Sequence, residues 1–169
     1  MTVIQNQILS ASQLKQKIRR IAFEIYENNV DETELVIAGV KGQGHTFAKQ
    51  LANVLQEISP IDTTPVLVDF DKDMPYDTPV TFDCDERFLE NKTIIVVDDV
   101  LNTGRTFAYS LSPFLSIPVK RVQVAVIVDR DYRRFPILAD YVGYELSTTI
   151  NDHVVVVLDD EQEMGVYLS

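Results

Sequence analysis

The apolar and polar positions of this chain follow two alternating patterns. Short continuous apolar runs are typical of strands buried on both faces of a parallel sheet. An uninterrupted run lies at residues 94–97, and further strands are expected at 35–40, 65–70 and 122–128, where Asp69 and Gln123 are the polar exceptions. Between them, apolar side chains recur at helical spacing from Ser10 to about Asn29, with Ser10 or Ser12 as a possible N-cap, and again from about His45 to Glu57. Strands that alternate with helices predict a doubly wound, mostly parallel α/β sheet flanked by helices.

The later part of the chain is less regular. A helix is expected from Phe107 to about Leu115, where Pro113 and Pro118 end it early. Short strands are expected at residues 139–142, 154–158 and 164–168. From about 71 to 91 the pattern gives way to Pro, Asp and Thr. A loop this long inside a compact domain is either functional or mobile.

The first of three candidate chemical sites follows the strand at 94–97. Two carboxylates, Asp98 and Asp99, come directly after the strand, and Thr103, Gly104 and Thr106 stand at the turn into the next helix. Unpaired N–H groups at such a turn favour an anion. The two acids must then face something other than a phosphate, either vicinal hydroxyls or a hydrated divalent metal ion. The sequence predicts a phosphate cup with an acidic rim.

Two further candidate loops follow other strands. Lys41, Gly42, Gln43 and Gly44 separate the strand at 35–40 from the next helix, and glycines allow a ligand to approach the backbone closely. The strand at 122–128 ends in Asp129, Arg130 and Asp131. In an open α/β sheet, ligands bind at the carboxyl ends of the strands. All three loops are therefore expected at one edge of the sheet.

Composition narrows the class of protein. The 169 residues, 46% of them hydrophobic, are expected to form one domain over residues 1–169. With no signal-like N-terminus and no window of membrane-spanning length, a cytoplasmic protein without membrane contact is expected. The net charge of −11 argues against non-specific binding to nucleic acid. The single cysteine, Cys84, excludes an internal disulfide.

The stretch IIVVDDVLNTGRT resembles the phosphoribosyl-diphosphate (PRPP) motif of the type I phosphoribosyltransferases. The resemblance implies their fold with a small hood, Mg²⁺, and transfer of ribose 5-phosphate from PRPP to a nucleobase. It implies that Asp98 and Asp99 hold the ribose hydroxyls as catalytic residues. The implied PRPP-binding residues are Val100, Leu101, Asn102, Thr103, Gly104, Arg105 and Thr106, and the implied diphosphate-binding residues are Val40, Lys41, Gly42 and Gln43. The segment of about 71–91 corresponds to the flexible hood loop.

From about Ile8 to Leu168 the chain is similar to pyrimidine-operon attenuation regulators that are also uracil phosphoribosyltransferases. This similarity implies a homodimer and a pyrimidine substrate such as uracil. The implied base-binding residues are Asp129, Arg130, His153 and Val154, and the implied metal ligands are Asp98, Asp99 and, for a second ion, Asp159. From the residues alone, His153 could equally be a surface histidine, and Asp159 could be one of several solvated acids.

Several positions depart from the family pattern and keep other functions open. Asn102 stands where purine-specific members carry an aspartate, and an amide cannot accept the proton that this role requires. Gln43 stands where an arginine is frequent, and the hood loop is acidic, with only Lys72 and Arg87 as cations. A PRPP or nucleotide sensor without turnover is therefore an alternative. A pyrimidine-responsive RNA regulator is a further alternative, although Phe23 and Leu138 occupy positions where a basic face is expected.

Overall fold

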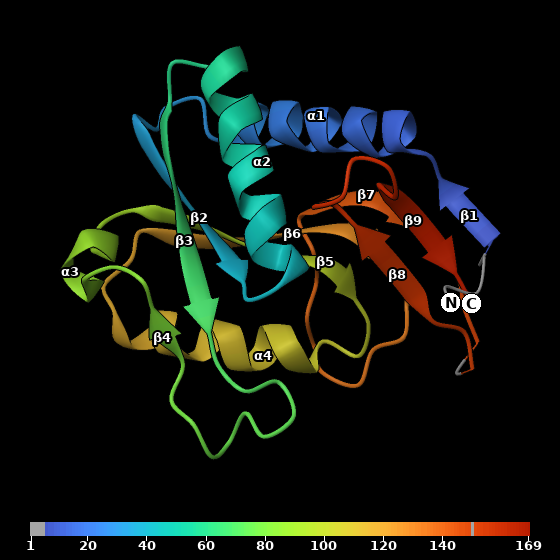
Figure 1. Ribbon diagram of the computed structural model, residues 1–169. Coiled ribbons are helices and arrows are strands. Elements are labelled where there is room, and N and C mark those ends of the chain that lie inside the picture. Colours follow the sequence, from blue (N-terminus) through green and yellow to red (C-terminus); the bar gives the residue numbers. More distant parts are fainter. Residues whose placement is uncertain (1–5, 150) are drawn as a thin grey trace.

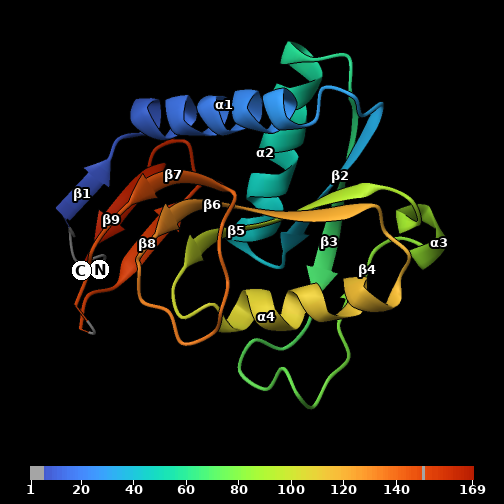
Figure 2. The same cartoon turned by 180° about the vertical axis from the view of Figure 1, so that it is seen from behind.

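A central sheet of six strands lies between two layers of helices in the computed structural model, which describes residues 6–149 and 151–169 (Figures 1 and 2). The strand order is β4-β3-β2-β5-β6-β7. All neighbours pair in parallel except β4, which runs antiparallel to β3. The strands are β2 (Glu34–Val40), β3 (Asp62–Asp69), β4 (Thr81–Phe82), β5 (Thr93–Leu101), β6 (Arg121–Asp129) and β7 (Tyr141–Glu145). The predicted doubly wound α/β class is confirmed.

Helices α1 (Ala11–Asn28) and α2 (Gln43–Ile58) cover one face of this sheet, and α4 (Arg105–Leu111) with the 3₁₀ helix η1 (Ser112–Ser116) covers the other (Figure 1). Of the two predicted N-caps for α1, the structure selects Ser10. Its hydroxyl accepts from the Gln13 N–H, and the Gln13 side chain accepts from the Ser10 N–H. This reciprocal capping box satisfies two donors at the helix start. None of the described helices combines the length and apolar character needed to cross a membrane.

Two hydrophobic cores form because successive side chains of a strand point to opposite faces. On β2, Leu35 and Ile37 pack toward α1 and α2, whereas Val36, Ala38 and Val40 pack toward α4 and η1. All five are buried. A strand buried on both faces has no polar alternation, which explains the continuous apolar runs in the sequence.

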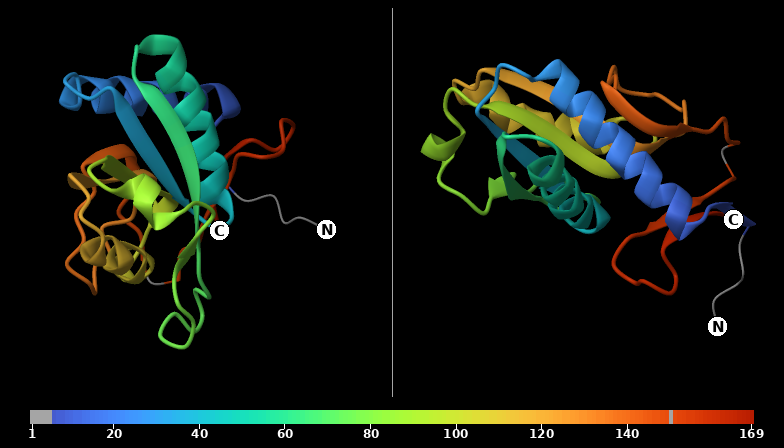
Figure 3. Two further views of the ribbon diagram at one scale, coloured as in Figure 1. Left: turned by 90° about the vertical axis from the view of Figure 1, so that its left-hand side faces the viewer. Right: turned by 90° about the horizontal axis from the view of Figure 1, so that it is seen from above.

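A second, three-stranded sheet brings the two ends of the described chain together beside α1 (Figure 3). Its order is β1-β9-β8, and all pairs are antiparallel. The strands are β1 (Asn6–Leu9), β8 (Val154–Val157) and β9 (Gly165–Leu168). The strand β1 was not predicted, because its four residues are too few to show a hydrophobic period. Its pairing partner, β9, lies at the other end of the chain. We call this small sheet the hood; it is distinct from the segment of about 71–91 that was predicted as the hood loop.

Several predicted boundaries shift. β5 does not end at Val97 but continues through Asp98 and Asp99 to Leu101, because the ladder with β6 extends to the pair Leu101–Asp129. β3 begins at Asp62 rather than Pro65, and β7 covers 141–145 rather than 139–142. The helix after the PRPP motif ends at Leu111 and continues as η1. The segment of about 71–91 contains β4 and the short helix α3 (Glu86–Leu89), so it is only partly a loop.

Candidate functional site

The three predicted loops lie at the carboxyl edge of neighbouring parallel strands. β2 pairs with β5, and β5 pairs with β6, so the turns after Val40 and Leu101 and the end of β6 share one edge. The hood strand β8 contacts β5 at this end of the sheet (Figure 2). The predicted convergence of the loops is confirmed.

Asp98 is a buried carboxylate at this edge. Its exposed fraction is only 4%, and its Oδ1 accepts a hydrogen bond of 2.9 Å from the Asp99 N–H. Burial, reinforced by the adjacent Asp99 carboxylate, raises the pKa of Asp98 well above its usual range, and the Lys72 ammonium opposes this rise. Lys72 Nζ lies 3.7 Å from Asp98 Oδ2. The half-buried Asp99 side chain accepts only from the Val100 N–H, at 2.9 Å, among the described hydrogen bonds.

The start of α2 packs directly against Asp98, and this close approach requires a glycine. A Cβ on Gly44 would lie 2.7 Å from Asp98 Oδ1 and 3.1 Å from the Val97 carbonyl oxygen. Carbon atoms do not approach oxygen so closely without displacement. Gly44 therefore sets the distance between the glycine loop and the acidic pair.

Replacing Gly44 with Ala is expected to lower the free energy of unfolding by about 1–3 kcal/mol, because the new methyl group overpacks a buried contact. Urea unfolding followed by circular dichroism measures this change. Gly42→Ala is a control for the effect of the methyl group, because a Cβ at Gly42 meets no atom within 4 Å, although its φ of +97° adds strain of its own. Equal free energies of unfolding for wild type and Gly44→Ala would contradict the packing argument.

The loop after β5 encloses a cavity of about 290 Å³. The cavity is lined by Lys72, Val100, Leu101, Asn102, Thr103, Gly104, Arg105, Thr106 and Phe107. These residues include every member of the predicted phosphate cup. Gly104 has a φ of +88°, and Ile137 and the Phe135 carbonyl leave no room for a side chain there. The cup is thus a formed hollow with one lysine from a distant loop at its rim.

The segment after β6 holds the phosphate cup in place. The Arg134 and Phe135 N–H groups both donate to the Thr103 carbonyl, at 2.8 and 2.9 Å. Arg133 NH1 donates to the Asn102 carbonyl at 2.9 Å, and its NH2 pairs with Asp129 Oδ1 at 2.6 Å. The cup therefore has a rigid support that sequence analysis did not identify.

Arg130 lies at the centre of this support and is nearly buried, with 9% exposure. Its NH1 donates to Asn102 Oδ1 at 2.9 Å and its Nε donates to Thr148 Oγ1 at 2.8 Å. Its NH2 donates to the carbonyls of Thr149 and Asp152, at 3.1 and 2.7 Å. Every guanidinium nitrogen is thus used to join the phosphate cup to the segment that leads into β8. The residues around Thr148 had no sequence signal, because only the fold brings them to Arg130.

The remaining predicted base-binding residues have different surroundings. Asp129 is held by Arg133 and by the Asp131 N–H, which donates to Oδ1 at 2.9 Å. Val154 is half-buried and packs against the core beneath α1 and α2. His153 is exposed, and its backbone pairs with Ser169 in both directions at 2.9 Å.

The predicted diphosphate loop begins at the buried end of β2. The Lys41 N–H donates to the Val68 carbonyl at 2.9 Å, and its ammonium lies 3.3 Å from Asp69 Oδ1. Gly42 has a φ of +97°, with open space where a side chain would stand. Gln43 Oε1 accepts from the Leu158 N–H at 3.1 Å, and its Nε2 donates to Asp159 Oδ1 at 3.2 Å. Gln43 therefore joins this loop to the turn between β8 and β9.

The two cations of the segment 71–91 separate in the structure. Lys72 lies on the loop after β3, which projects from the carboxyl edge of the sheet, and contacts Asp98 (Figure 1). Arg87 belongs to α3, just before the start of β5, and so lies toward the opposite edge. Only Lys72 can serve the site directly.

A metal site built from protein ligands alone is not present in the described part of the chain, where no three His, Cys, Asp or Glu side chains gather suitably. Asp98 and Asp99 adjoin each other, whereas Asp159 lies beside Gln43. Mg²⁺ is commonly held by one or two carboxylates together with substrate phosphates and water. The acidic pair fits that mode of binding, because it stands beside a phosphate-sized hollow.

Comparison with solved structures supports the fold. The chain superposes on a hypoxanthine-guanine phosphoribosyltransferase of Bacillus anthracis with a TM-score of 0.77 at 20% identity, covering 99% of both chains. It superposes on a hypoxanthine phosphoribosyltransferase of Trypanosoma cruzi with a TM-score of 0.73 at 19% identity, covering 96% of this chain and 93% of that one. At these identities the likeness concerns the fold alone.

Sequence comparison reaches further. The Bifunctional protein PyrR of Macrococcus caseolyticus is 31% identical, with 95% of this chain and 97% of the relative covered. The protein of the same name from Deinococcus radiodurans is 34% identical, with 95% of this chain and 91% of the relative covered. The family model described as a phosphoribosyl transferase domain matches residues 5–162. With its fold, its acidic pair and its loops arranged as described above, this chain belongs to the phosphoribosyltransferase family.

Proposed function

We propose that this protein transfers ribose 5-phosphate from PRPP to a pyrimidine base such as uracil and releases diphosphate. The observation that carries the proposal is the juxtaposition of the acidic pair Asp98–Asp99 with the cavity of about 290 Å³ under the loop 100–107. A sugar phosphate needs such a pair of neighbouring sites, one for hydroxyls and one for an anion. The whole chain, residues 1–169, acts as one domain in this proposal, and the homodimer and cytoplasmic location stay predictions.

In this proposal, different residues of the site bind different parts of PRPP. Asp98 and Asp99 accept hydrogen bonds from the ribose hydroxyls, and the loop from Asn102 to Thr106 binds the 5′-phosphate. Lys41 and the open backbone at Gly42 receive the diphosphate. Bond cleavage at the anomeric carbon develops an oxocarbenium-like centre and a leaving diphosphate, so the protein acts by positioning and by electrostatic stabilisation. No protein nucleophile is required.

Mg²⁺ is the cofactor that the family and the donor set suggest. Asp98 and Asp99 would hold it together with substrate oxygens, and it would supply positive charge beside the leaving diphosphate. Lys72 supplies protein charge at the same place, 3.7 Å from Asp98. A second ion at Asp159 stays a sequence prediction, since Gln43 is the hydrogen-bond partner of that carboxylate in the structure.

A pyrimidine acceptor is supported by the environment of Asn102. Its Oδ1 accepts from Arg130 NH1, and an amide in this role cannot take a proton from a purine ring. Asp129 is the last residue of β6, and Arg133 donates to its carboxylate. We assign the Asp129 side chain to the edge of the base. Arg130, His153 and Val154 belong to the same proposed base site, with Arg130 acting through Asn102 and the segment 148–152.

Asp99→Asn tests the ribose assignment. The variant is expected to raise the KM for PRPP about tenfold, about 1.4 kcal/mol, because an amide replaces a charged acceptor of a hydroxyl hydrogen bond. Steady-state assays of diphosphate release with varied PRPP measure the effect. Asp131→Asn, an exposed carboxylate just after β6, is the matched control and should keep the wild-type KM. An unchanged KM in Asp99→Asn would refute the assignment.

A PRPP sensor without turnover is the second candidate, and the environment of Gln43 favours it. Both ends of the Gln43 amide are engaged by Leu158 and Asp159, so this position adds no cation to the diphosphate loop. Calorimetric titration of PRPP with Mg²⁺, followed by uracil and an assay of diphosphate in the same sample, separates the two. Binding with release supports the enzyme, and binding without release for every base of a panel supports the sensor.

A further inference from the structure

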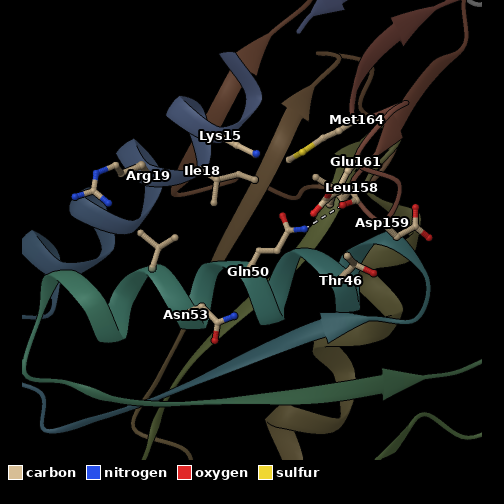
Figure 4. Close-up of a pocket in the computed structure, with 11 residues that line it drawn as sticks. Lys15, Ile18, Arg19, Thr46, Gln50, Asn53, Leu158, Asp159, Glu161 and Met164 are labelled. Atoms are coloured by element: carbon tan, nitrogen blue, oxygen red, sulfur yellow. Dashed lines mark hydrogen bonds between the residues drawn. The ribbon is translucent and has the colours of Figure 1, made fainter. Parts of the chain in front are cut away.

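A second, larger cavity lies outside the site described above, between α1, α2 and the turn that joins β8 to β9 (Figure 4). Its volume of about 620 Å³ lies in the range that holds small organic molecules. The apolar part of its lining consists of Ile18, Val54, Leu158 and Met164. None of the residues assigned to PRPP, diphosphate or base lines it, and of the predicted metal ligands only Asp159 does.

Hydrogen-bonding side chains stand in a row along the α2 wall of this cavity. Thr46, Gln50 and Asn53 follow the i, i+4, i+7 spacing of one helix face. In the view of Figure 4, Gln50 reaches toward Leu158, whereas Asn53 projects below α2. Only Gln50 has a partner among the described side-chain hydrogen bonds, donating from Nε2 to the Leu158 carbonyl at 3.1 Å. The Thr46 hydroxyl and the Asn53 amide are available to a ligand in the described part of the chain.

Charges of opposite sign come from opposite sides of the cavity. Lys15 and Arg19 belong to α1, whereas Asp159 and Glu161 belong to the turn after β8 (Figure 4). No ion pair within 4.0 Å joins the two sides among the described residues, and Lys15 pairs with no acid there. Arg19 is engaged outside the cavity, 3.8 Å from Glu57 and 5.4 Å from the centre of the Phe23 ring, so Lys15 is the cation that faces the cavity (Figure 4). Such a cavity matches a ligand with an anionic group at one end and hydrogen-bond donors at the other.

The wall of this cavity is joined to the diphosphate loop. The Leu158 carbonyl accepts from Gln50, the Leu158 N–H donates to Gln43, and Asp159 Oδ1 accepts from Gln43 Nε2. Gln43 uses only Oδ1 of Asp159, so a donor group from inside the cavity displaces Gln43 Nε2 when it takes this same oxygen. The Gln43 amide then becomes available to a diphosphate oxygen.

We propose that the cavity between α1, α2 and the β8–β9 turn is an effector site for a small organic anion that carries an amino donor, the class to which amino-bearing nucleoside monophosphates belong. The phosphate lies at Lys15, the ring lies on the apolar wall, and the amino group donates to Asp159 and Glu161. Occupation of the site strengthens diphosphate binding through Gln43. This last step, unlike the binding itself, rests on the proposed function.

Calorimetric titration with cytidine 5′-monophosphate tests the site. Uridine 5′-monophosphate is the matched analogue, because it lacks the amino donor. Since it is also the product expected of the active site, both nucleotides are titrated into wild type and Lys15→Ala, and only the binding that is lost in Lys15→Ala is assigned to the cavity. Cytidine monophosphate is expected to bind at least fivefold more tightly than uridine monophosphate, and Glu161→Ala is expected to reduce this preference. No binding of cytidine monophosphate, or an equal affinity for both nucleotides, overturns the proposal.

Charge variants locate the bound nucleotide. Lys15→Ala is expected to weaken cytidine monophosphate binding about tenfold, whereas Lys49→Ala, the same loss of charge on an exposed position of α2 outside the cavity, is expected to change it less than twofold. Equal losses in the two variants, or none in Lys15→Ala, place the nucleotide elsewhere and overturn the proposal.

Linkage to the diphosphate loop has its own measurement. Saturation with cytidine monophosphate is expected to tighten the binding of inorganic diphosphate about threefold, and diphosphate must tighten cytidine monophosphate binding by the same factor. Unchanged affinities overturn the coupling. If the proposed transferase function is itself wrong, diphosphate and PRPP fail to bind, while the nucleotide titrations above still decide the cavity.

Discussion

Replacing Arg130 with Met is expected to destabilise the protein by about 3 kcal/mol and to lower kcat/KM for PRPP about a hundredfold, about 2.7 kcal/mol. The nearly buried guanidinium donates to Asn102, Thr148, and the carbonyls of Thr149 and Asp152. A methionine fills similar space without any donor, so these oxygens are left unpaired. The phosphate cup and the segment that leads into β8 then lose their common attachment.

Urea unfolding and steady-state kinetics on the same preparations measure both effects. Arg130→Lys is the conservative control: it keeps the charge, but one ammonium cannot reproduce the fork of the guanidinium. It is expected to recover part of the stability and less of the activity. Wild-type kinetics in Arg130→Met would show that the attachment between Asn102 and the segment 148–152 is unnecessary for the site.

Asp98→Asn is expected to separate stability from binding. Burial, and then the neighbouring Asp99, raises the pKa of Asp98 in the folded protein. The charged form of this carboxylate therefore lowers the free energy of unfolding when no ligand is bound. An uncharged amide of the same shape removes this cost, and about 1 kcal/mol of added stability is expected near neutral pH. The affinity for PRPP should fall about a hundredfold, because the buried charge is needed to accept ribose hydroxyls.

The pH dependence of this gain has a definite sign. The folded state holds the proton of Asp98 more tightly than the unfolded chain does, so this group costs stability as the pH rises from its ordinary pKa through the raised one. Asp98→Asn should therefore be more stable than wild type at pH 7 and equal to it in acid, below the ordinary pKa of an aspartate. Thermal unfolding from pH 3.5 to 8, in the presence of a metal chelator, measures the difference. A gain that is largest in acid would contradict the assignment of the buried charge.

Local patterns in the sequence were enough to determine the class of fold and the position of the acidic pair. The runs at 35–40, 94–97 and 122–128 are apolar except for Gln123, as strands covered on both faces require, so the parallel sheet could be predicted from them. Because ligands of such sheets bind at the carboxyl ends of the strands, the loops predicted after Val40 and Val97 were correctly expected to share an edge, although β5 runs on to Leu101. Glycines at 42 and 104 marked turns whose φ values are indeed positive.

Boundaries and supports depended on partners far away in the chain. β1 forms because β9 offers a free edge, and β5 runs on through Asp98 because β6 continues beside it. The local pattern of apolar and polar residues predicts neither the formation of β1 nor the extension of β5. Lys72 and Arg87 were both predicted as the cations of the segment 71–91. Only Lys72 contacts Asp98, because Arg87 belongs to α3 and lies toward the opposite edge of the sheet.

Motifs alone predicted the groups of the candidate site: two carboxylates, a hydroxyl-rich glycine turn, and a second glycine loop after a buried strand. How those groups are held became clear from the folded chain. Folding buried Asp98, committed Arg130 and Gln43 to hydrogen bonds between separate segments, and opened a cavity beside α1 that no motif marks. The physical reason is that motifs record local backbone chemistry, whereas burial and hydrogen-bond partners are set by residues that are neighbours only after folding.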